Sequence, residues 1–222
     1  TSKSKGVLLK NYNMMHAILA YQRTLDITDQ DKTIIPIPIY LVTGMIALLG
    51  LFLHAGGTVY LHKFFDAKKV LQCAAEQKIT FFHASPTVFT LLLEESVNFP
   101  KIPSLRSFAC GSSNMPPENI RRIKQWLPQA DFHTVYGLTE TSSPATILPI
   151  GAADSPYIGS SGVPVPGNRL KIVGSDGCEL PAGEVGEVLL CGSTILEEYY
   201  QMDSPAITPD GWLHTGDLGY CN

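Results

Sequence analysis

The stretch that decides the fold class is LRSFACGSSNMPPENIRRIKQWLPQADFHTVY, residues 105–136. Its first part, residues 105–113, predicts a buried strand that ends in a turn. Residues 116–128 predict a helix, because proline is favoured in the first turn of helices, and residues 130–136 predict a second strand. A strand, a helix and a strand in this order are typical of a βαβ unit with parallel strands.

The same alternation extends toward the amino terminus. Helices are predicted at residues 10–25, 66–78 and 86–96, and strands at residues 56–61 and 79–85. We therefore predict an α/β fold for residues 1–149, with a parallel sheet and flanking helices.

The pattern changes after residue 149. Residues 149–168 are rich in glycine, proline and serine, which is typical of a linker or an irregular crossover. The following segments, RLKIVG (169–174) and GEVGEVLLCG (183–192), predict hairpin strands. Residues 150–222 are therefore expected to form a small β-rich, barrel-like subdomain.

One long apolar run allows two interpretations. Residues 34–53 carry no charge and are long enough to span a bilayer. However, Pro36 and Pro38 forbid a regular helix at its start, and Gly44 and Gly50 interrupt the rest. The same residues also fit a buried strand at about residues 33–40 that leads into a buried helix at about 43–54. We therefore predict no transmembrane span.

The composition excludes several classes of partner and site. The net charge is −4, from 16 basic and 20 acidic residues, and no basic tract exceeds the pair Arg121–Arg122, so we expect no nucleic-acid partner. Five scattered cysteines without a CxxC pair favour a reduced, cytoplasmic location. The chain opens with TSKSKGVLLK, without a signal peptide or an initiator methionine, so we expect a fragment of a longer protein.

Three small polar stretches fall where ligands bind in open parallel sheets, beyond the carboxyl ends of strands. They are CGSSNM (110–115), YGLTETSS (136–143) and, at the opening of the chain, TSKSKG (1–6). Each alone also fits a tight turn or a solvated tail. Their common position favours a ligand site.

The stretch 136–143 offers the groups that a nucleotide with its metal requires. Tyr136 presents a ring on which a nucleobase stacks, and Thr139 offers a hydroxyl to a phosphate oxygen. Glu140 offers the hard oxygen ligand that Mg²⁺ prefers. In GWLHTGDLGY (211–220), Asp217 could accept hydrogen bonds from both ribose hydroxyls. The alternative for both segments is an ordinary turn.

In combination these segments resemble the adenylate-forming, or AMP-binding, superfamily, and in particular its acyl-CoA synthetases. VYGLTET is preceded by GSSNMPP and followed by GWLHTGDLGY, and the match runs along essentially the whole chain in the family's order. The resemblance implies that the chain is an internal fragment of the large N-terminal domain. The small C-terminal domain of the same polypeptide would then lie beyond residue 222.

For the nucleoside of ATP or AMP, the resemblance implies that Tyr136 stacks on adenine and that Asp217 binds the ribose. The small residues Gly111, Ser112 and Ser113 would lie along the ring and the near end of the acyl group.

For the phosphates, the resemblance implies that Thr139 holds the α-phosphate and Glu140 the Mg²⁺, and these two are the expected catalytic residues. Gly137 lets the backbone come close to the ligand. Thr1 and Lys5 would be what remains of a pyrophosphate clamp, whose front half is absent from the chain.

For the acyl group, the resemblance implies that Gly44, Ser142 and Ser143 lie near the pocket and that Leu41 stands at its gate. The family's gate residue is usually aromatic or histidine, so Leu41 is a departure. Residues 33–61, which should supply much of the wall, contain no Asp or Glu to meet an ammonium group. We therefore expect an apolar acyl or aryl acid rather than an amino acid.

The implied reaction is the ATP-dependent activation of a carboxylic acid as acyl-adenylate, followed by thioester formation with coenzyme A. This chain alone is expected to be inactive in the complete reaction. A non-catalytic nucleotide-binding or interaction protein on the same fold is an alternative, motivated by Leu41. An adenylation domain that loads a carrier protein is another, and it differs only in the thiol acceptor.

Overall fold

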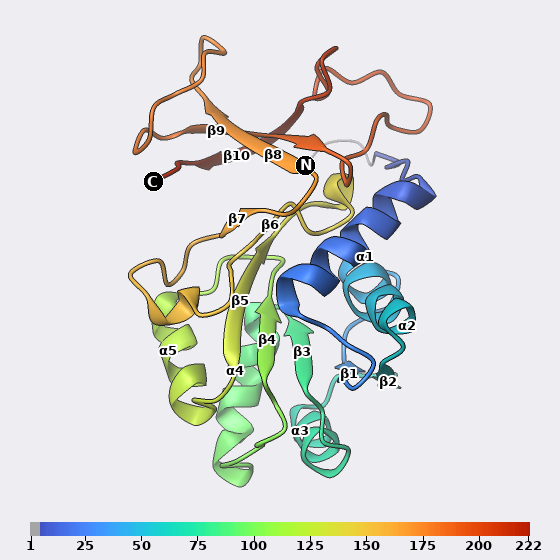
Figure 1. Ribbon diagram of the computed structural model, residues 1–222, viewed down its shortest axis with the longest axis vertical. Coiled ribbons are helices and arrows are strands. Elements are labelled where there is room, and N and C mark those ends of the chain that lie inside the picture. Colours follow the sequence, from blue (N-terminus) through green and yellow to red (C-terminus); the bar gives the residue numbers. More distant parts are fainter. Residues whose placement is uncertain (1–4) are drawn as a thin grey trace.

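Five parallel strands form most of the larger sheet in the computed structural model, which describes residues 5–222 (Figure 1). The order in this sheet is β2-β1-β3-β4-β5-β6-β7, and the last two strands are antiparallel to their neighbours. The strands are β1 (Lys32–Ile35), β2 (Thr58–Leu61), β3 (Phe81–Ala84), β4 (Ser107–Cys110), β5 (Asp131–Tyr136), β6 (Thr146–Ile147) and β7 (Val163–Pro164).

Helices cover both faces of this sheet (Figure 1). One face packs against α3 (Ala67–Glu76), α4 (Pro86–Glu95) and α5 (Pro117–Trp126), and the other against α1 (Asn11–Leu25) and α2 (Leu51–Ala55). Phe89 of α4 shows how the first face is held, because its ring meets those of Phe82, Phe108 and Phe132 on three adjacent strands. Alternate side chains of each strand thus feed two separate cores.

The second sheet is small and antiparallel, in the order β10-β9-β8. Its strands are β8 (Asn168–Val173), β9 (Gly186–Gly192) and β10 (Leu213–Gly219). The predicted fold class, a sheet with flanking helices followed by a β-rich unit, is confirmed. The larger sheet nevertheless extends beyond the boundary expected at residue 149, because β7 pairs with β6.

The apolar run at residues 34–53 folds inside the domain. Strand β1 ends at Ile35, five residues earlier than about residue 40 as predicted, because Pro36 and Pro38 lack the N–H that continues a ladder. A π-helical segment, Thr43–Gly50, then leads directly into α2. No helix among residues 5–222 is long and apolar enough to cross a membrane.

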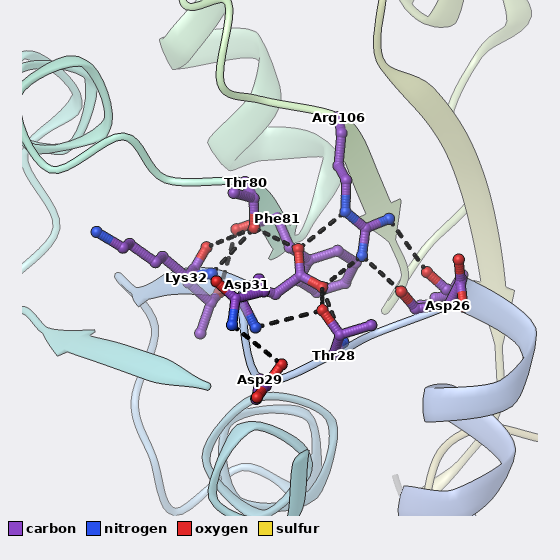
Figure 2. A network of polar contacts seen from close by, with 11 residues as sticks. Asp26, Thr28, Asp29, Asp31, Lys32, Thr80, Phe81 and Arg106 are labelled. Carbon is purple, nitrogen blue, oxygen red and sulfur yellow. Dashed lines mark hydrogen bonds and ion pairs between the residues drawn. The ribbon is translucent and has the colours of Figure 1, made fainter. Parts of the chain in front are cut away.

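A partly buried ion pair stabilises the other end of the sheet, where the strands begin (Figure 2). Asp31, just before β1, is 3% exposed and accepts from Arg106 Nε at 2.8 Å and Nη2 at 2.6 Å. Thr80 Oγ1 donates to the same carboxylate at 2.6 Å. Burial acts to raise the pKa of Asp31, but the bonds from Arg106 and Thr80 outweigh it and hold the pKa below its usual value.

Arg106→Ala is expected to lower the free energy of unfolding by about 2–3 kcal/mol, because it leaves the buried carboxylate of Asp31 without its charged partner. Arg121→Ala is the matched control. Arg121 meets Glu118 at 3.4 Å on the exposed surface of α5, and such pairs contribute about 0.5 kcal/mol. Urea unfolding of both variants measures the difference, and equal losses would show that the Asp31 pair is not a structural anchor.

Candidate active site

A pocket of about 190 Å³ opens at the carboxyl ends of the parallel strands. It is lined by the segments that follow β1, β4 and β5, together with residues of β3 and β5 themselves. Six of the predicted site residues line it. They are Leu41, Gly111, Ser112, Gly137, Thr139 and Ser143, and the remaining lining residues are Val42, Thr43, His83, Val135 and Leu138.

The loop after β5 is held tightly enough to fix Thr139. A Cβ at Gly137 would lie 2.8 Å from Thr141 Oγ1, so a side chain is excluded there. Thr141 Oγ1 accepts from the backbone N–H of Leu138 at 3.0 Å, which holds the 3₁₀ turn Thr139–Thr141. Thr139 itself is exposed at the pocket edge, where its hydroxyl can meet a ligand oxygen.

Tyr136 and Asp217 come from the two different sheets and meet at the site. The hydroxyl of Tyr136 donates to Asp217 Oδ2 at 2.7 Å. Burial and, after it, the Asp217 carboxylate raise the pKa of Tyr136, so its hydroxyl remains a neutral donor. Asp217 is exposed and is thus accessible to a ligand beside the tyrosine ring.

Glu140 is positioned by a residue that the sequence did not reveal. Tyr199 is buried, and its hydroxyl donates to Glu140 Oε1 at 3.0 Å. Burial and the neighbouring carboxylate raise the pKa of Tyr199 to about 12. Lys5 Nζ lies 5.0 Å from the centroid of the Tyr199 ring, so the opening segment reaches the neighbourhood of Glu140. Thr1 lies outside the described residues.

The donor set fits a magnesium ion that arrives with a nucleotide. Residues 5–222 contain no group of three or more His, Cys, Asp or Glu side chains that could hold a metal. Mg²⁺ is usually held by one or two carboxylates together with phosphate oxygens and waters, rather than by an all-protein cage. A single carboxylate at Glu140 meets that requirement.

Seven predicted site residues among residues 5–222 do not line the pocket, namely Lys5, Tyr136, Glu140 and Asp217, described above, and three others. Ser142 is fully buried and donates to the backbone oxygen of Thr194 at 2.9 Å. Gly44 is buried against the backbone, since a Cβ there would lie 2.6 Å from the carbonyl oxygen of Pro38. Ser113 is exposed, one residue beyond the part of the turn that faces the pocket.

His83 is a pocket residue that sequence reasoning missed. It stands on β3, is 1% exposed and lines the pocket. Burial and, to a smaller degree, the nearby His133 lower its pKa to about 3, so the imidazole is neutral. The available signal was its place near the carboxyl end of the apolar strand ITFFHAS, where ligands bind.

His83 makes stability depend on pH. Its pKa of about 3 in the folded state lies below the unfolded value of 6.5, so the unfolded chain binds more protons between these limits. Stability is therefore complete above about pH 6.5 and falls as the pH drops toward 3, by up to about 1.4 kcal/mol per pH unit from this group. His133, whose pKa is also lowered by burial, adds to the same trend.

Unfolding by urea between pH 4 and pH 7 measures this slope. His83→Gln is expected to flatten it, whereas His54→Gln, at an exposed residue of α2, serves as the control and should leave it unchanged. An identical slope in the wild type and His83→Gln would contradict the assignment.

Comparison with known proteins agrees with this geometry. The family model described as AMP-binding enzyme matches residues 1–200. The chain belongs to this family. Among curated relatives, a sulfoacetate–CoA ligase from Cupriavidus necator is 32% identical over 224 residues, covering 99% of this chain and 43% of the relative.

Solved structures of AMP-binding family members show the same fold. The o-succinylbenzoate CoA synthetase from Bacillus subtilis, in complex with its acyl-adenylate intermediate, superposes with a TM-score of 0.90 at 30% identity. This match covers 99% of the present chain and 44% of the synthetase. The same synthetase in complex with ATP and magnesium gives a TM-score of 0.89. The chain thus spans less than half the length of these relatives.

Proposed function

We propose that the whole protein activates a carboxylic acid with ATP and transfers the acyl group to coenzyme A. The observation that carries this proposal is the grouping of four residues beyond the carboxyl end of β5. Thr139 lines the pocket, Glu140 follows it in the same loop, and Tyr136 at the end of β5 is hydrogen-bonded to Asp217. A site for an adenylate requires an aromatic ring for the base and a hydrogen-bond acceptor for the ribose hydroxyls. It also requires a hydrogen-bond donor for the phosphate and a carboxylate for the metal. The CoA ligases among the relatives support the same reaction class.

The chemistry asks for alignment rather than for a strong base. A carboxylate oxygen of the acid forms a bond to the α-phosphorus of ATP while the bond from that phosphorus to pyrophosphate breaks. The sulfur of coenzyme A then bonds to the acyl carbon, AMP leaves, and the thiol proton passes to solvent. Holding the reacting groups close together and correctly oriented accounts for much of the rate enhancement in reactions of this kind.

The positions of the residues support the roles that the family resemblance implies. Tyr136 stacks on adenine and Asp217 binds the ribose, while Thr139 donates to the α-phosphate. Glu140 holds Mg²⁺, which supplies positive charge to the phosphates when it is bound. Lys5, above the ring of Tyr199, contributes charge on the pyrophosphate side.

The acid is an apolar acyl or aryl acid, with no charge besides that of its reacting carboxylate. Among the residues that line the pocket there is no Lys, Arg, Asp or Glu. A second charge on the acid would therefore be buried without a partner, which is costly. In this respect the pocket differs from what sulfoacetate, the acid in the name of one relative, would require.

Acid-dependent exchange of labelled pyrophosphate into ATP by the whole protein tests the proposal, with short-chain, long-chain and aromatic acids compared. We expect exchange with acids that carry no charge besides the carboxylate, and no exchange with α-amino acids. Offering coenzyme A and a phosphopantetheinyl carrier protein in parallel then identifies the thiol acceptor. Binding of AMP without exchange for any acid would instead favour a non-catalytic nucleotide-binding protein.

A further inference from the structure

We propose that the acid substrate is a small molecule whose neutral hydroxyl group forms a hydrogen bond with His83 at the floor of the pocket. This inference rests on the proposed function and goes further, because it names the group by which the pocket selects its acid. Three observations support it: the position of His83, the absence of a hydrogen-bond partner for its Nδ1 within residues 5–222, and the size and charge of the pocket.

The position of His83 follows from the register of the sheet. His83 on β3 pairs with Ala109 on β4, which in turn pairs with His133 on β5, so the two histidines lie in one row. His133 is satisfied, because its Nδ1 lies 2.9 Å from the carbonyl oxygen of Leu148. His83 differs from it in both respects, because it lines the pocket and its Nδ1 has no partner in the described part of the chain.

The unpartnered imidazole of His83 is directed at the ligand space. Its Nδ1 is fully buried and has no hydrogen-bond partner within residues 5–222. The other nitrogen, Nε2, lies beside Gly111, which lines the pocket and where a Cβ would be 3.5 Å away. Because Gly111 has no side chain, nothing from that residue separates Nε2 from the pocket. Nε2 is therefore the ring nitrogen that a ligand atom can reach.

The neighbouring polar groups restrict the choice of that atom. The hydroxyl of Tyr21, whose ring packs against His83, is already paired with Ser143 Oγ at 3.0 Å. No charged side chain of residues 5–222 lines the pocket, and the buried imidazole is neutral. A carboxylate or an ammonium group would lack a counter-charge there. A hydroxyl both donates and accepts, so it matches either tautomer of the ring.

The volume of the pocket restricts the size of the acid. About 190 Å³ is available, and a cavity of about 150 Å³ accommodates a benzene ring. Gly111, Ser112 and Thr139 of the same lining are assigned to the nucleotide, so the acid occupies only part of this volume and a long acyl chain does not fit. The inferred class is a hydroxylated aryl acid with a single ring, or a short hydroxy acid.

Matched pairs of acids test this inference on the whole protein. Benzoate is compared with 3- and 4-hydroxybenzoate, and butanoate with 4-hydroxybutanoate, by kcat/KM in ATP–pyrophosphate exchange. At least one hydroxy acid is expected to exceed its parent by about tenfold, the contribution of one hydrogen bond to a buried group. Calorimetric binding of the benzoyl and hydroxybenzoyl sulfamoyl-adenosines gives the same ratio without turnover.

Variants assign the preference to His83. His83→Phe removes both ring nitrogens and should bring the hydroxy-to-parent ratio close to one, whereas His83→Gln keeps a hydrogen-bonding group and should restore part of it. His133→Gln, in the same row but away from the pocket lining, should keep the wild-type ratio. Thermal unfolding of each variant establishes that it folds, and the wild-type ratios stand without any variant.

The outcomes separate the inference from the proposed function. Exchange with equal kcat/KM for every hydroxy acid and its parent, or a preference that His83→Phe leaves intact, would overturn the role of His83 and leave adenylation standing. Absence of exchange with all acids, although ATP binds, would overturn the proposed function and the inference with it.

Discussion

Replacing Glu140 with glutamine is expected to lower kcat for acid-dependent ATP–pyrophosphate exchange by about 100- to 1,000-fold. The amide keeps the shape of the side chain and an oxygen for the hydroxyl of Tyr199, which donates to Glu140 Oε1 at 3.0 Å. It removes the negative charge that attracts a divalent cation. The loss should therefore fall on catalysis more than on folding.

Glu198 provides the matched control for this substitution. It precedes Tyr199 in the sequence, yet its side chain is exposed. Glu198→Gln is expected to change kcat by less than about twofold, as surface substitutions usually do. Raising the concentration of Mg²⁺ should recover part of the activity of Glu140→Gln and none in Glu198→Gln. Full activity of Glu140→Gln at low Mg²⁺ would show that another group binds the metal.

Asp217→Ala is expected to raise KM for ATP by about 10- to 100-fold. The carboxylate would accept from two ribose hydroxyls, and a hydrogen bond to a charged acceptor contributes about 1.5–3 kcal/mol. Only part of this is lost, because water replaces the carboxylate at an exposed site. Initial rates over a range of ATP concentrations separate this effect from one on kcat.

Two further variants test whether the effect belongs to the ribose site. Tyr136→Phe removes the donor that lies 2.7 Å from Asp217 Oδ2 but keeps the ring, so KM for ATP should rise only a few-fold. Asp210→Ala alters an exposed aspartate of the preceding turn, which accepts from Thr208, and should leave KM unchanged. Equal KM values for Asp217→Ala and the wild type would remove Asp217 from the site.

The sequence predicted the order of the strands and helices because hydrophobic periodicity and proline placement are local signals. It was less accurate where the backbone departs from regular geometry. The strand expected to reach residue 40 ends at Ile35, and the following helix begins with π-helical turns. The pairing of β7 with the larger sheet depends on contacts across the chain, which no local pattern encodes.

The candidate site likewise contains residues that the sequence reveals and residues that it does not. Tyr136, Thr139, Glu140 and Asp217 are recognisable because they lie in short motifs at strand ends. Tyr199, which positions Glu140, lies far from it in the sequence, and its role appears only when the segment after β9 and the loop after β5 are brought together. His83 likewise sits in an apolar strand, where a buried histidine carries no motif.

The fate of oxygen in the acid tests the formation of an acyl-adenylate most directly. The whole protein is incubated with ATP, Mg²⁺, coenzyme A and an accepted acid labelled with ¹⁸O in both carboxylate positions. Attack of the acid on the α-phosphorus predicts AMP that carries one ¹⁸O atom, together with unlabelled pyrophosphate. Formation of ADP with ¹⁸O in the released phosphate, or of AMP without label, would contradict activation through an adenylate.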